Sequence, residues 1–110
     1  MGALIETLES GKSYVDAYKA AGYSDGWSAY GAYAYDAANA IIAALKTSLP
    51  EAADVASAKQ KTIDAIASVT FDGATGKVGF DQYGDAVTKT LTVYVVEKGA
   101  WTPKKTGEVK

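Results

Sequence analysis

WSAYGAYAYDAANAIIAALK, residues 27–46, is the stretch that decides the fold. Apolar residues recur in it at spacings of three and four, which predicts one long helix. Ser28 is the expected N-cap, because its hydroxyl can accept a hydrogen bond from a free amide of the first turn. The broad apolar face would consist of Tyr30, Ala34, Ala37, Ala38, Ile41 and Leu45. Only Asp36 and Asn39 are clearly polar before Lys46, so we expect this helix to be buried on more than one side.

Two shorter helices are expected before this stretch. The first contains Leu4, Ile5 and Leu8 and would end at Gly11, since glycine is a common helix stop. Ser13 would cap the second, which has Tyr14 and Tyr18 on its apolar face and would end at Gly22. The segment 23–26, Tyr-Ser-Asp-Gly, is typical of a turn.

A further helix is expected after the long one. Pro50 should interrupt the helical pattern, because proline disfavours helical geometry at the residue before it. An amphipathic helix then runs from Pro50 or Asp54 to Ser68.

Beyond Ser68 the hydrophobic period changes from helical spacing to alternation, which indicates strands. In 71–81, glycine turns frame a short strand with Val78 and Phe80 on one face. The segment 91–97, LTVYVVE, is the strongest strand signal, and both its faces are expected to be covered. Lys98-Gly99 is a hairpin-like break, Trp101 begins a return strand, and residues 103–107 are expected to form a frayed tail.

Composition narrows the class of protein. The chain has 110 residues, 48% of them apolar, which is enough for one small domain. Its net charge is −2 with both signs interspersed, so we expect no nucleic-acid partner. Cysteine and histidine are both absent, which removes thiolate nucleophiles, zinc fingers and imidazole bases. We therefore expect no enzyme, no catalytic residue, no metal site and no cofactor.

Three segments, in order, carry a resemblance to a known family. They are a Tyr-Asp-Ala-Ala helix in 30–45, the turn-strand-turn FDGATGKVGFD in 71–81, and the terminal strand with Gly-Ala-Trp in 91–101. The ordered set resembles the C-terminal third of type I periplasmic binding proteins, and is most similar to the branched-chain amino acid (leucine/isoleucine/valine) receptors of ABC importers. The resemblance covers residues 13–101, whereas 1–12 match nothing in the family.

The resemblance implies a fold class and an incomplete architecture. We expect an α/β fold, or α+β as a fragment: part of a periplasmic-binding-protein lobe, with three to four helices followed by a short β-hairpin-like region and a long C-terminal strand. Residues 1–110 would form a single domain. Whole family members close a pair of α/β lobes on a small solute, and the parallel strands of the N-terminal βαβ units are missing here.

The resemblance also implies a function. The chain would be the C-terminal portion of the substrate-binding component of an ABC transporter for branched-chain amino acids or similar small solutes, incomplete for binding by itself. Its partners in the full-length context would be an amino acid and the transporter permease. The family implies a periplasmic or extracytoplasmic location, although the first ten residues do not have the pattern of a signal peptide. The alternative is a standalone, self-associating paralogue that binds no solute.

Candidate site residues follow from the same resemblance. An aromatic at the start of the Tyr-Asp-Ala helix can face the ligand in the family, and here it is Tyr30, with Trp27 near it. The competing interpretation is that both are core or interface aromatics. Asp36 is interpreted as a structural hydrogen-bonding group. Asp72, Asp81 and Asp85 lack the ligand spacing of an EF-hand calcium loop and fit turn chemistry better.

The long helix carries apolar residues almost all round, and one small domain cannot cover them all. We therefore expect a homodimer, in which each copy covers the other.

Overall fold

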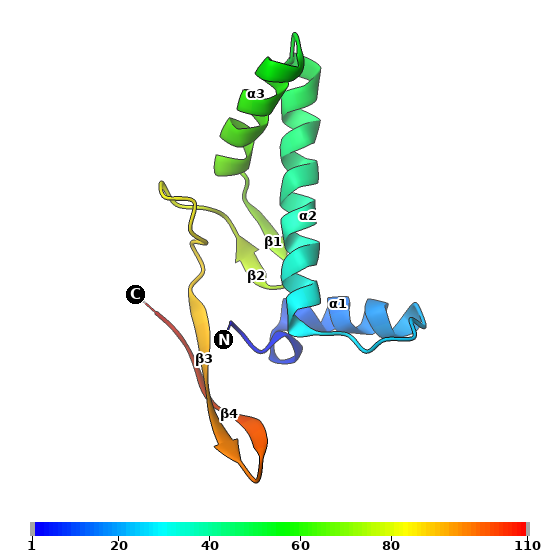
Figure 1. The fold of residues 1–110 in the computed structure, drawn as a ribbon, viewed down its shortest axis with the longest axis vertical. Helices are drawn as coiled ribbons and strands as arrows, with labels where there is room; N and C mark the ends of the chain where they lie inside the picture. Colours follow the sequence, from blue (N-terminus) through cyan, green and yellow to red (C-terminus); the bar gives the residue numbers. More distant parts are fainter. Residues whose placement is uncertain (1, 110) are drawn as a thin grey trace.

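The computed structural model describes residues 2–109, and it is a mixed α+β fold (Figure 1). Its strands pair antiparallel, as two separate two-stranded sheets, β1-β2 and β3-β4. The expectation of α+β is confirmed at this level. In chain order the elements are η1 (Ile5–Thr7), α1 (Glu9–Ala20), α2 (Ala29–Ser48), η2 (Leu49–Glu51), α3 (Val55–Ala67), β1 (Phe71–Gly73), β2 (Gly76–Val78), β3 (Thr90–Glu97) and β4 (Ala100–Glu108).

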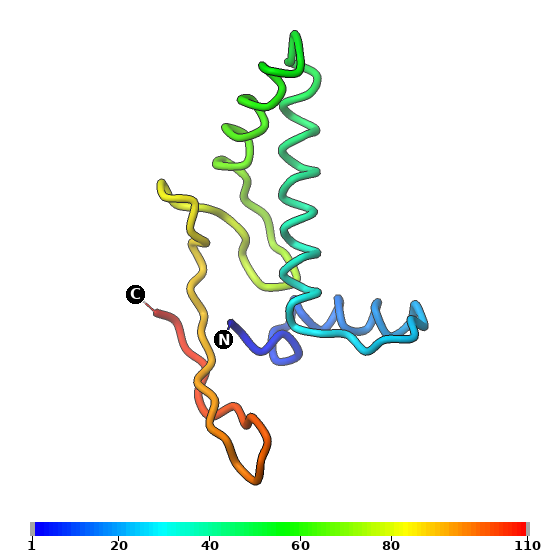
Figure 2. Tube along the Cα trace, viewed as in Figure 1, coloured from blue at the N-terminus to red at the C-terminus, as the bar shows by residue number. Residues whose placement is uncertain are grey.

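The 20-residue helix α2 is the axis of the molecule (Figure 2). α3 folds back along its C-terminal half, and the β1-β2 hairpin lies against its N-terminal half. α1 runs across the lower end of α2, and the β3-β4 ribbon projects away from the helices (Figure 1).

The caps at the starts of α2 and α3 follow the sequence. The Ser28 side chain accepts a hydrogen bond from the Gly31 N–H at 3.3 Å, so the predicted N-cap of α2 is confirmed. Asp54 and Ser57 form a capping box at the start of α3. The Ser57 backbone N–H and hydroxyl stabilise the Asp54 carboxylate and lower its pKa below the ordinary value.

The buried side of α2 is not the predicted one. The residues that α2 buries lie four apart along a single narrow stripe: Ala32, Asp36, Ala40, Ala44 and Ser48. Most of the predicted face is turned outward: Tyr30 and Ile41 are among its exposed side chains, and Leu45 is half-buried. Small side chains let α3 approach closely, and the Ser48 and Thr62 hydroxyls share a 2.8 Å hydrogen bond across that contact.

Gly11 does not end a helix, and Ser13 does not begin one. Both lie inside α1, which begins at Glu9. Gly11 is required there for a different reason, because a side chain at this position would collide with the Ile5 carbonyl group. The close approach of η1 to α1 therefore explains the glycine.

The predicted frayed tail is also wrong. Residues 103–107 belong to β4, which pairs with β3 along its whole length. The Thr92 and Thr106 hydroxyls lie 3.0 Å apart across the ribbon. At the tip, Lys98 and Gly99 both have positive φ, as a two-residue turn between strands requires. The hairpin-like break at these residues is confirmed.

The faces of β3 are less covered than expected. Leu91, Val93 and Val96 are all exposed, because no helix among residues 2–109 packs extensively on the ribbon. The radius of gyration is 16.8 Å. A compact domain of about this length would have a radius of gyration near 13 Å. The elongated shape therefore leaves much apolar surface open.

Gly11→Ala tests the contact between η1 and α1. Alanine normally stabilises a helix interior over glycine by about 1 kcal/mol, but here we expect a loss of about 2 kcal/mol from the collision with Ile5. Urea melts followed by circular dichroism measure the difference. Gly26→Ala is the control, because a methyl group added there would have no residue other than its chain neighbours within 4 Å, and this variant should not be destabilised. A stabilised Gly11→Ala protein would contradict this packing.

Candidate functional site

Asp36 of α2 holds the tip of the β1-β2 hairpin. The residue is only 3% exposed. One carboxylate oxygen accepts the Ala74 backbone N–H at 2.9 Å, and the other accepts the Thr75 N–H at 2.8 Å and the Thr75 hydroxyl at 2.6 Å. Ala74 and Thr75 are the two loop residues between the paired Gly73 and Gly76. The carboxylate therefore satisfies the amide groups that the loop leaves unpaired.

The residues around this contact are small or polar for a geometric reason. A side chain at Gly73 would bring its Cβ within 2.6 Å of the Asp36 carboxylate. On the other side of the loop, the Ser10 hydroxyl of α1 donates to the Ala74 carbonyl at 3.3 Å. α1, α2 and the hairpin thus meet at one point. The interpretation of Asp36 as a structural hydrogen-bonding residue is confirmed.

A small apolar core adjoins the Asp36 contact. Its buried members are Ile5, Val15, Ala32 and Ala74. Leu8, Tyr14 and Trp27 pack against it from outside. The core therefore fixes how α1, α2 and the hairpin tip are arranged.

The two predicted ligand-binding residues have different surroundings. Trp27 is half-buried against this core, while Tyr30 is 76% exposed on the first turn of α2. Neither lines the largest hollow of the described residues. Their role in binding stays a prediction.

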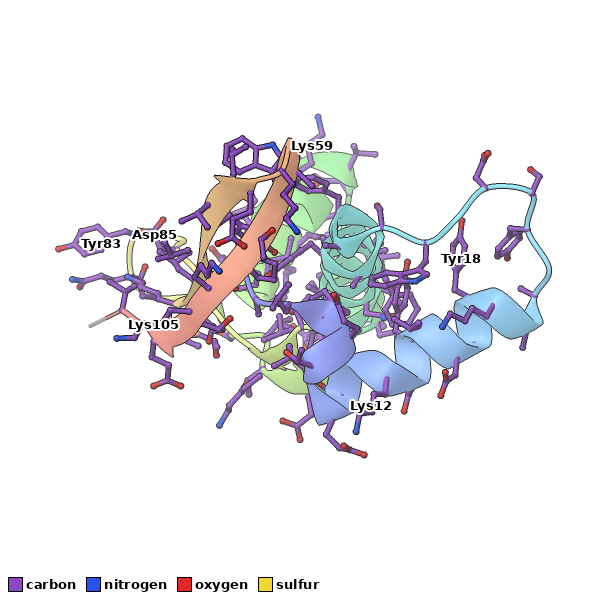
Figure 3. All side chains as sticks on the ribbon, turned by 90° about the horizontal axis from the view of Figure 1, so that it is seen from below. Lys12, Tyr18, Lys59, Tyr83, Asp85 and Lys105 are labelled. Atoms are coloured by element: carbon purple, nitrogen blue, oxygen red, sulfur yellow. The ribbon has the colours of Figure 1, made fainter. Side chains whose placement is uncertain are left out.

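The largest hollow lies between α1, α2 and β1 and has a volume of about 800 Å³. Its lining is mainly apolar and rich in aromatic rings: Tyr14, Tyr18, Tyr23, Tyr35 and Phe71. Ring centroids are 5.6 Å apart for Tyr14 and Tyr35, 6.1 Å for Tyr14 and Tyr18, and 4.9 Å for Tyr18 and Tyr23. The rings thus form a continuous wall. Figure 3 shows Tyr18 between α1 and the loop that leads to α2.

The polar groups of this hollow are neutral or acidic. The polar residues of its lining are Ser10, Ser13, Asp36, Asn39 and Asp72. Among the described residues no lysine lines it. Sequence periodicity does not reveal this hollow. It places Tyr14 and Tyr18 on one helix face, but the contribution of the other tyrosines depends on the tertiary fold.

Asp81 stabilises the turn that follows it. Its Oδ1 accepts the backbone N–H groups of Tyr83 and Asp85 at 2.9 and 3.0 Å, so the interpretation as turn chemistry is confirmed. The bond from Tyr83 is the main reason that the pKa of Asp81 is lowered, with Lys89 at 3.8 Å adding to it. Within residues 2–109 no three acidic side chains are grouped closely enough to hold a metal ion.

None of the described helices is both long and apolar enough to span a bilayer. No protein-family model, curated protein or solved structure matches this chain.

Asp36→Ala should destabilise the protein strongly. The substitution leaves the Ala74 and Thr75 N–H groups and one hydroxyl without their acceptor, so we expect a loss of roughly 3 kcal/mol or more in the free energy of unfolding. Chemical denaturation measures it. Asp16→Ala, at an exposed position of α1, is the matched control and should change stability by less than about 0.5 kcal/mol. Equal losses in the two proteins would contradict the structural role of Asp36.

Proposed function

We propose that this chain is the C-terminal portion of the substrate-binding component of an ABC transporter for branched-chain amino acids or similar small solutes. The observation that carries the proposal is the contact between its two most characteristic segments. Asp36 belongs to the Tyr-Asp-Ala-Ala helix, and its carboxylate holds the loop of the FDGATG hairpin. Both motifs are thus parts of one structural unit, which favours a common origin over chance similarity of separate short segments.

The finer architecture belongs to the same proposal. The three helices, the hairpin and the terminal ribbon would form part of one lobe of a type I periplasmic binding protein. The outward apolar face of α2 would be covered by the rest of that protein. Ile41 and Ile42, which are 48% and 49% exposed, support a missing neighbour at this face.

Solute binding would need the complementary lobe. Small-molecule pockets bury about 70–90% of a ligand's surface, and a single wall cannot do so. Tyr30 would contribute one exposed ring at the start of α2, with Trp27 beside the core behind it. A single aromatic contact adds about 1 kcal/mol beyond its buried area, whereas micromolar affinity needs about 8 kcal/mol.

The proposal implies a location and two partners. The assembled receptor would work in the periplasm or another extracytoplasmic space. It would bind an amino acid and deliver it to the transporter permease.

A second candidate function is a standalone protein that self-associates and binds no solute. The exposed apolar residues on α2, α3 and the ribbon favour it, because a second copy could cover them. A two-fold homodimer is then expected. Light scattering at micromolar concentration distinguishes a dimer from a monomer, and a monomer would remove this candidate.

The solute-binding proposal predicts different results for the isolated chain and for a complemented one. By itself the chain should show no saturable binding of leucine, isoleucine or valine below about 1 mM, because one wall cannot enclose the solute. Mixed with the N-terminal part of a branched-chain amino acid receptor, it should bind one of them with micromolar affinity. Calorimetry measures both.

Tyr30→Ala is the variant that tests the site in the complemented protein. It should weaken binding by about tenfold, the equivalent of about 1.4 kcal/mol. Tyr83→Ala, at a turn far from α2, is the control and should bind like the wild type (Figure 3). Micromolar binding by the isolated chain would show that it builds its own pocket. Absence of binding after complementation would contradict the receptor proposal.

A further inference from the structure

The tyrosine-lined hollow between α1, α2 and β1 has the features of a ligand site that is separate from Tyr30. Its volume of about 800 Å³ lies within the range of small-molecule pockets, about 300–1,000 Å³. We propose that it binds a small organic cation with an apolar body, such as a quaternary ammonium compound. This inference does not depend on the proposed amino-acid receptor.

Aromatic rings are the first reason. A ring face carries partial negative charge and attracts a cation, most effectively when several rings surround it. The planes of Tyr14, Tyr18 and Tyr23 are inclined to their neighbours by 42° and 54°, and that of Tyr35 to Tyr14 by 49°. Tilted rings do not cover each other's faces as a stack would, so their faces stay available to a ligand.

Charge complementarity is the second reason. Asp36 and Asp72 line the hollow, and no lysine within residues 2–109 does. The Asp36 carboxylate is already bonded to the hairpin loop, which leaves Asp72 as the other acidic residue of the lining. Lys77 is paired with Asp72 across the hairpin, so the two side chains share one face of it and Lys77 offsets part of the Asp72 charge, although Lys77 does not line this hollow. The ion pairs among the described residues do not include Asp72.

The cation is preferred over an anion or a zwitterion by the same charges. A carboxylate on the ligand would meet a lining that contains two acidic residues and, among the described residues, no basic one. An uncharged apolar ligand would gain contact with the rings but nothing from Asp72. The occupant is therefore a cation whose positive group is wrapped in methyl or methylene groups, which a tyrosine wall can contact.

The test compares choline with its neutral isostere, 3,3-dimethylbutan-1-ol, on the 110-residue protein. The two have nearly the same shape, so only the charge differs. NMR titration of the tyrosine ring protons should show saturable binding of choline with at least about fivefold higher affinity than the isostere. Equal affinities, or no saturable binding of choline, would overturn the proposal.

Variants distinguish the contributions of the Tyr18 ring, its hydroxyl group and the Asp72 carboxylate to choline binding. Tyr18→Phe should keep choline affinity because the ring remains, while Tyr18→Ala should weaken it about threefold or more. Asp72→Asn should reduce the preference for choline over the isostere. Tyr83→Ala is the control, since Tyr83 is 81% exposed and lies at the other end of the molecule from Tyr18 (Figure 3).

Tyr23→Ala keeps the test decisive if Tyr18→Ala fails to fold. Tyr23 lies in the exposed loop after α1, where truncation should not disturb the fold. Tyr23→Ala should weaken choline binding as Tyr18→Ala does, with an unchanged circular dichroism spectrum. Wild-type affinity in both alanine variants would exclude the tyrosine wall as the binding site.

Discussion

The hydrogen bonds from the hairpin loop to Asp36 are the constraint on which the arrangement of this protein depends. A carboxylate buried in a helix must find donors, and a two-residue hairpin loop has amide groups that its own strands do not use. The Asp36 carboxylate accepts hydrogen bonds from the Ala74 and Thr75 N–H groups, which lie 38 and 39 residues further along the sequence. The orientation of α1 follows, because Ser10 binds the same loop from the other side.

Local signals predict several caps and turns of this chain correctly. Ser28 before α2, Asp54 before α3, and Lys98-Gly99 between β3 and β4 are cap and turn residues whose effect reaches only a few neighbours, and each lies where the sequence indicates. The structural role of Asp36 is also predicted, but through resemblance and without its donors. Gly11 is misread because glycine has two uses, helix termination and close approach, and only the position of Ile5 distinguishes them.

Tertiary choices could not be predicted in the same way. In α2 the bulky face and the small-residue stripe are both apolar, so periodicity cannot say which one meets α3. The size of the side chains decides which face is buried. Ala40 and Ala44 let another helix approach closely, whereas Ile41 would hold it further away. The tyrosine-lined hollow could not be predicted from the sequence for a related reason. Tyr18 and Tyr23 come from α1 and its following loop, and Tyr35 comes from α2.

The β3-β4 ribbon bears on the dynamics of the chain. Its strands bond to each other from Thr90 with Glu108 to Glu97 with Ala100, while no helix among the described residues covers them extensively (Figure 1). Few apolar contacts would be broken if the ribbon opened, so its amide protons should exchange with solvent sooner than those of α2. The molecule thus combines a segment that opens locally with a helical part whose opening requires disruption of the buried carboxylate contact.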